Sequence, residues 1–251
     1  MRLLLASLAL AATIPEGDLD VPYVPTPPAA VERMLDMAEV GADDYLIDLG
    51  SGDGRIAIAA AQRGARALGV DLDPTRVEEA HGAARFAGVE TRALFRRQDL
   101  FRTPLREASV VTMYLLPDIN LALRPRLLTE LRPGSRVVSH NFTLGDWRAD
   151  AEAEVGNSRI FLWIVPAVVG GSWTLHLADG TTLPLEIEQR FQDASGTLGS
   201  DRLTGVTLRG TSFRFDSGRR SFHGIVGDAA IEPDPEAPAD AERGWLVRRV
   251  E

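Results

Sequence analysis

The segment Tyr45-Leu-Ile-Asp48-Leu-Gly50-Ser-Gly52-Asp-Gly54-Arg55 constrains the fold of this chain more than any other stretch. A short apolar run ends near an acidic residue and leads into three glycines at alternate positions. Because glycine lacks a Cβ and tolerates positive φ, we expect a buried strand entering a tight loop that a nucleotide-like ligand can approach at backbone distance. The alanine-rich residues 56–63 contain no Pro, which predicts a helix whose N-terminus faces that ligand.

The spacing of the glycines narrows the type of ligand. Dinucleotide sites usually show G-x-G-x-x-G with an acid further along the chain, whereas here the spacing is G-x-G-x-G and Asp48 precedes it. The pattern D-x-G-x-G-x-G resembles motif I of the class I S-adenosylmethionine-dependent methyltransferases. The resemblance implies S-adenosyl-L-methionine as the cofactor, bound by Asp48, Gly50, Ser51, Gly52, Asp53 and Gly54. The alternative is that the glycines serve close packing alone.

Two further acids follow the next two predicted strands. Asp71 directly follows the apolar run 67–70. Ligands of open α/β sheets bind outside the carboxyl ends of the strands, so the Asp71 carboxylate can accept hydrogen bonds from both ribose hydroxyls of an adenosyl group. The alternative is a helix cap, but Asp73 is better placed for that, with Pro74 at the first helical position. Asp99 lies in a segment that resembles the methyltransferase segment whose acid meets the adenine amino group.

The rest of the first 166 residues alternates helices with apolar strands, as a doubly wound α/β sheet requires. The prolines of residues 20–28 favour an extended path, and Thr26 can cap a helix over residues 29–40. Tyr23 to Thr26 is expected either to fold across the cofactor as a lid or to be a rigid lead-in. Asp118 or Asn120 is expected to open a later helix. Seven strands are expected, at 45–49, 67–70, 93–97, 110–116, 136–140, 151–155 and 160–165, with the last strand antiparallel.

Several motifs together resemble one methyltransferase family. They are Val21-Pro-Tyr-Val-Pro-Thr26, Asp48 to Arg55, Tyr114-Leu-Leu-Pro117, Leu123-Arg-Pro-Arg-Leu127, Leu131 to Phe142 and Gly145-Asp-Trp147. They are similar to a bacterial family related to the mitochondrial lysine methyltransferases of the adenine nucleotide carrier and an ATP synthase subunit. The resemblance implies protein-lysine N-methylation by in-line transfer, with Tyr23 and Thr26 also at the cofactor.

Tyr114 and His140 are the residues that we expect to line the acceptor pocket. They end neighbouring strands, and class I enzymes commonly hold the methyl acceptor at the end of the fourth strand. The alternatives are a core role for Tyr114 and a loop-capping role for His140. Trp147 is expected either to wall the pocket or to pack beneath the last hairpin.

The pattern changes after Pro166. Gly170-Gly171 has the composition of a linker, and short alternating runs then follow, separated by turn signals such as Ala178-Asp-Gly180 and the Pro-rich residues 232–238. We expect a small antiparallel β domain of six or more strands, a sandwich or a partly closed barrel. The expected division is a leader at 1–20, a methyltransferase domain at 21–166 and the β domain at 170–251.

Composition limits the partners. The net charge is −9 and all 27 basic residues are arginine, so the chain cannot methylate its own lysines and is not expected to bind nucleic acid through a basic run. Without cysteine it has no disulfide or thiolate catalysis, and its four histidines show no metal-ligand spacing. The acceptor is therefore expected to be a protein or a small molecule.

The N-terminus leaves the location open. Arg2 and the apolar residues 3–12 have the charge, the apolar core and the small-residue end of a short signal peptide, too short to span a bilayer as a helix. The alternative is a peripheral N-terminus on a cytoplasmic protein. Two other function classes also stay open, a nicotinamide-dependent oxidoreductase and a non-catalytic cofactor-binding scaffold.

Overall fold

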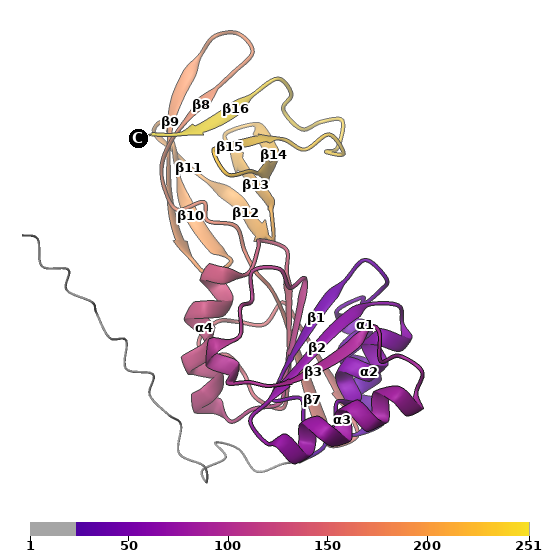
Figure 1. Ribbon diagram of the computed structural model, residues 1–251. Helices are drawn as coiled ribbons and strands as arrows, with labels where there is room; N and C mark the ends of the chain where they lie inside the picture. Colours follow the sequence, from indigo (N-terminus) through magenta and orange to yellow (C-terminus); the bar gives the residue numbers. More distant parts are fainter. Residues whose placement is uncertain (1–23, 251) are drawn as a thin grey trace, which may run out of the picture.

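The computed structural model describes residues 24–250, and the first part of this range forms a seven-stranded sheet with helices on both faces (Figure 1). The predicted leader at 1–20 and the predicted site residue Tyr23 lie outside the described residues. In chain order the elements are α1 (Pro28–Met37), β1 (Tyr45–Leu49), α2 (Arg55–Gln62), β2 (Arg66–Asp71), α3 (Pro74–Phe86), β3 (Ala93–Arg97), the 3-10 helix η1 (Leu100–Arg102), β4 (Val110–Met113), α4 (Pro117–Glu130), β5 (Arg136–His140), β6 (Ala151–Val155) and β7 (Ser158–Ile164).

The strand order confirms the doubly wound sheet. It runs β3-β2-β1-β4-β5-β7-β6, with β1 to β5 parallel and β7 antiparallel to both of its neighbours. The order reverses between β1, which pairs with β2, and β4, which follows β3 in the chain. Such a reversal opens a crevice outside the carboxyl ends of the strands, where open α/β sheets bind their ligands.

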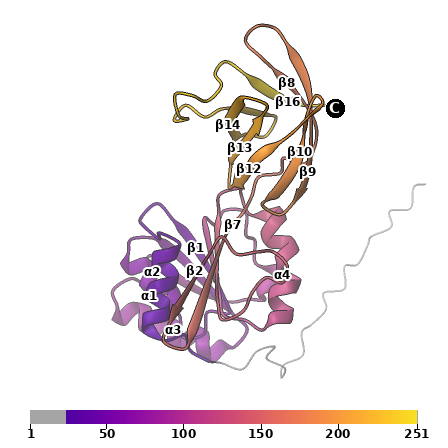
Figure 2. The same cartoon turned by 180° about the vertical axis from the view of Figure 1, so that it is seen from behind.

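Two apolar cores sandwich this sheet. Helices α1, α2 and α3 cover one face, where alanines such as Ala57, Ala60 and Ala80 let the helices approach closely. Helix α4 covers the other face through Leu123 and Leu127 (Figure 2). Fully buried strand residues, with burial on both faces, explain the uninterrupted apolar runs in the sequence.

Several predicted helix ends are wrong. Helix α1 begins at Pro28 with Pro27 as its N-cap, so Thr26 does not cap it, and proline's fixed φ serves at the first turn instead. Helix α4 begins at Pro117 with Leu116 as N-cap, earlier than Asp118 or Asn120. Strand β4 ends at Met113, so Tyr114 lies in the loop that follows it. The predicted cap at Asp73 is confirmed, because its Oδ1 accepts a hydrogen bond from the Thr75 N–H at 2.8 Å.

The second part of the chain is a separate antiparallel sheet of nine strands. Its strands are β8 (Gly171–His176), β9 (Thr182–Arg190), β10 (Asp193–Leu198), β11 (Asp201–Arg202), β12 (Thr204–Arg209), β13 (Ser212–Ser217), β14 (Arg220–Val226), β15 (Ala230–Pro233) and β16 (Leu246–Arg249). Aromatic side chains, among them Trp173, Phe213, Phe215 and Phe222, fill its interior. The sheet rolls up into a near-barrel, because its two edge strands, β11 and β12, follow one another in the chain and only Leu203 separates them.

The predicted β domain is confirmed in type and differs in detail. Gly171 is the first residue of β8 and not part of a linker, and Gly170 is held by a hydrogen bond from its N–H to the Gln189 Oε1. Glu232 and Pro233 belong to β15, although the prolines there predicted a turn. Proline is tolerated at Pro233 because β16 pairs only with Ala230 and Ile231, so no ladder hydrogen bond to β16 is lost there.

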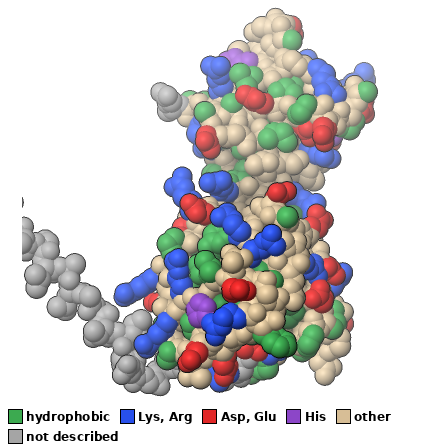
Figure 3. Space-filling view, turned by 45° about the vertical axis from the view of Figure 1, so that its right-hand side comes forward, with side chains coloured by type: hydrophobic (Ala, Val, Ile, Leu, Met, Phe, Trp, Pro, Cys, Tyr) green, Lys and Arg blue, Asp and Glu red, His purple; other side chains and the backbone are tan. Residues whose placement is uncertain are grey.

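The near-barrel adjoins one end of the seven-stranded sheet (Figure 1). Contacts with Gly134, just before β5, show that this is the end where β5 begins. The Ala167 N–H donates to the Gly210 carbonyl, and a Cβ on Gly210 would lie 3.0 Å from the Gly134 Cα. The two units meet at a visible waist (Figure 3). The cavity described below lies at the opposite end of the parallel strands.

Candidate functional site

A cavity lies at the carboxyl ends of β1, β2, β3 and β4, at the point where the strand order reverses. Its walls come from residues 24–26, which we call the strap, the glycine loop that follows β1, residues 70–73, Gln98, Leu100 and Tyr114. Four of its lining residues are aspartates, Asp48, Asp53, Asp71 and Asp73, against two arginines, Arg55 and Arg76. The excess of carboxylates favours a ligand that carries positive charge and hydroxyl groups.

The glycine loop has the predicted backbone. Gly50, Gly52 and Gly54 have φ of 76°, 52° and 81°, a region that favours glycine. Packing also fixes Gly54, because a Cβ there would lie 2.6 Å from the Phe95 ring. Gly50 is packed as well, since a Cβ there would lie 2.8 Å from the Leu115 Cδ2. Gly50 and Gly52 line the cavity and Gly54 does not.

Asp48 is buried at the floor of the cavity, with 2% of its surface exposed. Its Oδ1 accepts a hydrogen bond from the Thr112 hydroxyl of β4 at 2.8 Å. Burial raises the pKa of this carboxyl to about 7, the Thr112 hydrogen bond opposes the rise, and the negative charges of Asp71 and Asp53 add to it. A positively charged ligand nearby would favour the ionised form.

The carboxylate of Asp71 is held by two backbone amides. Its Oδ2 accepts from the Gly52 N–H at 2.8 Å and its Oδ1 from the Asp73 N–H at 2.9 Å. Each carboxylate oxygen can accept more than one hydrogen bond, so both oxygens can still accept from a ligand. These contacts link the end of β2 to the glycine loop and set the orientation of the carboxylate.

Asp99 differs from the other predicted acids. It is not among the residues that line the cavity, whereas its neighbours Gln98 and Leu100 are. Its Oδ1 accepts from the Phe101 N–H at 2.8 Å, so it caps η1. The buried hydroxyl of Ser51, in contrast, lines the cavity and has no hydrogen-bond partner within residues 24–250.

Thr26, His140 and Tyr114 form one cluster at the other side of the cavity. The Thr26 hydroxyl lies 3.1 Å from the His140 Nδ1, and the rings of His140 and Tyr114 have centroids 3.9 Å apart. His140 is 2% exposed and its burial lowers its pKa to about 4, so the ring is neutral at pH 7. Its Nε2 is buried without a partner in the described part of the chain. Tyr114 and Thr26 line the cavity and His140 does not, which places His140 behind them.

Two asparagines that we did not predict as site residues hold the loop after β5. Asn141, at φ 63°, directs its Nδ2 to the Tyr114 hydroxyl at 3.3 Å and its Oδ1 to the Arg159 N–H. The fully buried Asn120 of α4 donates to the carbonyls of Phe142 and Thr143. Trp147, further along this loop, is buried against Trp163 and Phe191 and does not line the cavity.

Arg55 is a further contact of the strap that the sequence did not reveal. Its Nη1 donates to the Thr26 carbonyl at 2.9 Å, while its other donors engage the Asp53 carboxylate. The tripeptide Asp53-Gly-Arg55 signals the pairing of these two charged side chains, whereas nothing near it in the sequence indicates the contact with Thr26. Within residues 24–250, no group of three or more acidic or histidine side chains is placed to hold a metal ion. No helix in that range is both long and apolar enough to cross a membrane.

Comparison with known proteins identifies relatives of this site. Residues 48–151 match the family model described as the ANTKMT methyltransferase domain. A protein-lysine N-methyltransferase of Saccharolobus islandicus is 42% identical over 151 residues, 58% of this chain and 94% of that protein. The adenine nucleotide translocase lysine N-methyltransferase of Mus musculus is 38% identical over 148 residues, 59% of this chain and 64% of that protein.

A solved structure is also similar to this chain. The crystal structure of an RNA methyltransferase from Salinibacter ruber in complex with S-adenosyl-L-homocysteine is 46% identical, with a TM-score of 0.57, over 58% of this chain and 96% of that one. Methyl donor chemistry is common to these relatives, and none of them supports the nicotinamide-dependent alternative.

Proposed function

The chain belongs to the ANTKMT methyltransferase family of S-adenosylmethionine-dependent enzymes, and from this membership we propose that it methylates a lysine side chain of a protein. The observation that carries the lysine proposal is the match to the protein-lysine N-methyltransferase of Saccharolobus islandicus over nearly the whole length of that protein. We further propose that residues 21–166 form the catalytic domain and residues 170–251 an accessory β domain.

The residues of the cavity fit the methyl donor. When bound, S-adenosylmethionine supplies a methyl group on a positively charged sulfur. We propose that Asp71 accepts hydrogen bonds from the ribose hydroxyls and that Ser51, whose hydroxyl has no described partner, donates to the donor as well. The Asp48 carboxylate faces the same cavity and, in its ionised form, attracts the positive charge of the donor.

Tyr114 is the residue that we propose to touch the acceptor amine. It lines the cavity, and Asn141 and His140 fix its hydroxyl and its ring. His140 acts through Tyr114 and Thr26 in this scheme, which makes it a positioning residue. Because His140 is neutral, it adds no positive charge that would repel an approaching lysine.

In-line transfer needs little from the protein beyond placement. A lysine ammonium must first lose its proton, and burial of the amine against Tyr114 and the strap would lower its pKa. Holding the neutral amine in line with the methyl group can contribute about 7–11 kcal/mol to catalysis. The strap, held by Arg55 and His140, forms one side of the cavity.

RNA is a second candidate acceptor, favoured by two observations. A crystal structure of 46% identity is that of an RNA methyltransferase. The segment 91–106 also carries five arginines, Arg92, Arg96, Arg97, Arg102 and Arg106, and all five are exposed. Phosphate groups bind such clusters, although the net charge of −9 opposes general association with nucleic acid.

One labelling experiment distinguishes the acceptors. The purified chain is incubated with tritiated S-adenosylmethionine and a lysate, and aliquots are treated with protease or with ribonuclease. Label that protease removes and that amino-acid analysis recovers as methyllysine supports the lysine proposal, and label that ribonuclease removes supports RNA. The chain contains no lysine, so methyllysine cannot arise from the enzyme itself. Label in neither fraction would overturn both acceptor proposals.

A further inference from the structure

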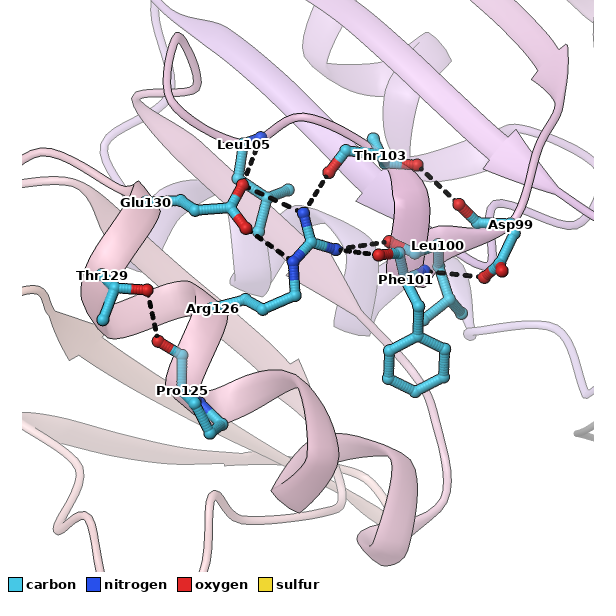
Figure 4. Close-up of polar contacts among 9 residues, drawn as sticks. All are labelled: Asp99, Leu100, Phe101, Thr103, Leu105, Pro125, Arg126, Thr129 and Glu130. Atoms are coloured by element: carbon cyan, nitrogen blue, oxygen red, sulfur yellow. Dashed lines mark hydrogen bonds and ion pairs between the residues drawn. The ribbon is translucent and has the colours of Figure 1, made fainter. Parts of the chain in front are cut away.

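A single arginine on α4 gathers the carbonyl groups of the segment between β3 and β4. Arg126 Nη1 donates to the carbonyls of Leu100 and Phe101 at 3.2 and 2.6 Å, and its Nη2 donates to that of Thr103 at 2.8 Å (Figure 4). These carbonyls belong to η1 and the turn after it, where they have few partners of their own. Arg126 therefore sets the path of residues 100–103.

The glutamate one turn later on α4 completes the arrangement. Glu130 accepts from Arg126 Nε at 2.6 Å and from Nη2 at 3.0 Å, and its Oε2 also accepts from the Leu105 N–H at 3.3 Å. The hydrogen bond from Arg126 lowers the pKa of Glu130, so the pair is charged at neutral pH. A planar guanidinium can donate hydrogen bonds to a carboxylate and three carbonyls at once, and the ammonium group of a lysine cannot.

The segment that Arg126 holds continues directly into the wall of the cavity. The Gln98 Nε2 donates to the Thr103 hydroxyl at 2.8 Å, and that hydroxyl donates to the Asp99 carbonyl at 3.1 Å. Gln98 and Leu100 both line the cavity, on the side of β3. Arg126 itself does not line it, so any effect of this residue on a ligand passes through residues 98–103.

We propose that Arg126 is a positioning residue that sets the adenine end of the methyl-donor site by holding residues 98–103 in place. The proposal rests on the proposed function, in which the donor fills this cavity with its ribose at Asp71. Beyond the ribose, the cavity extends to Gln98 and Leu100 at the end of β3, and the adenine ring is the part of the donor that this end can contact. Groups that read a base must hold their orientation, because a misplaced partner leaves buried polar atoms unpaired.

The test compares variants of two arginines on the same helix. Arg124 is the matched control, since it also bonds a backbone carbonyl, that of Leu144, and an acid, Asp146, but contacts the loop after β5. Binding of S-adenosylhomocysteine and of S-inosylhomocysteine, in which the amino group of the base is replaced by oxygen, is measured by calorimetry for the wild type, Arg126→Gln, Arg126→Lys and Arg124→Gln. The ratio of the two dissociation constants reports the recognition of the base.

We expect Arg126→Gln to bind S-adenosylhomocysteine about tenfold more weakly and to lose most of the preference for adenine, while Arg124→Gln keeps both. Arg126→Lys keeps the positive charge and is the more conservative change. Its affinity and its preference for adenine should lie between those of the wild type and of Arg126→Gln. Unchanged affinity and base preference in both Arg126 variants would overturn the proposal, as would an equal loss in Arg124→Gln. If the wild type itself binds no S-adenosylhomocysteine, the proposed donor site fails as well.

Discussion

The hydroxyl of Thr26 lies 3.1 Å from the Nδ1 of His140, which joins the strap at the start of the described chain to the end of β5. The contact spans 114 positions of sequence and is buried. The same threonine offers its carbonyl to Arg55, the first residue of α2. One residue of the strap is thus fixed from two sides of the cavity.

Removing the Thr26 hydroxyl is expected to loosen the strap. Thr26→Val keeps the shape of the side chain but leaves the Nδ1 of His140 unpaired in a buried place, which costs about 1–3 kcal/mol. We expect a lower melting temperature and a KM for S-adenosylmethionine that rises about tenfold. Thr26→Ser, which keeps the hydroxyl, is the control, and equal values for both variants would contradict this role of the contact.

The buried His140 predicts acid sensitivity. Its pKa is about 4 in the folded protein and 6.5 in the unfolded chain, so between these values the unfolded chain binds more protons. The stabilisation is complete above pH 6.5 and falls as the pH drops to 4, by about 3 kcal/mol in total. Urea unfolding between pH 4 and 7 should show this loss in the wild type and a smaller one in His140→Asn. The variant His81→Asn on α3 controls for the loss of a histidine.

The raised pKa of Asp48 predicts that this group makes the ligand-free protein less stable as the pH rises, the opposite of the effect of His140. It also predicts that binding of the donor depends on pH. With its pKa raised to about 7, the folded state keeps a proton that the unfolded chain releases near pH 4, so this group lowers stability as the pH rises through that range. Affinity for the cationic donor should rise about tenfold between pH 6 and 8 as the carboxyl ionises. Calorimetry should find Asp48→Asn weak and independent of pH.

A second variant checks that Asp48 is the group responsible. The Thr112 hydrogen bond favours the ionised carboxylate, so Thr112→Val should move the midpoint of the binding profile to higher pH. An unchanged midpoint would assign the profile to another group.

Tyr114→Phe separates the phenol from the ring. The variant keeps the ring that stacks on His140 and loses the hydroxyl that accepts from Asn141. If the hydroxyl positions the acceptor, kcat should fall about tenfold while the affinity for S-adenosylhomocysteine stays within twofold, because that interaction is made in the transition state and not with the donor alone. Single-turnover rates with the labelled donor give the measurement, and an unchanged rate would leave Tyr114 a role in packing only.

The parts of the fold that were predicted correctly are those with strong local patterns. The buried run before Asp48, the three glycines and the cap at Asp73 are determined by residues close in sequence, and the structure has all of them. The predicted helix cap at Thr26 is wrong, and the reason lies in the tertiary structure. A threonine before a proline-led helix predicts a cap, but the partner of its hydroxyl, His140, lies on a distant strand and is outside the reach of any local rule.

The same limit applies to Arg126, Asn120 and Arg55. Each lies on a helix with an ordinary sequence, and its role comes from backbone carbonyls that tertiary structure brings to it. Hydrophobic periodicity cannot identify such partners, because every residue has a backbone carbonyl and the sequence does not show which ones accept from a side chain. In the near-barrel, strands β10 and β11 carry only a weak alternating pattern, since Asp193, Ser195 and both residues of β11 are polar and exposed.

The near-barrel is attached where the parallel strands begin, and the cavity is built where they end. The chain passes from one unit to the other at a single junction, near Ala167. The near-barrel therefore packs against one end of the sheet and contributes no residue to the lining of the donor cavity.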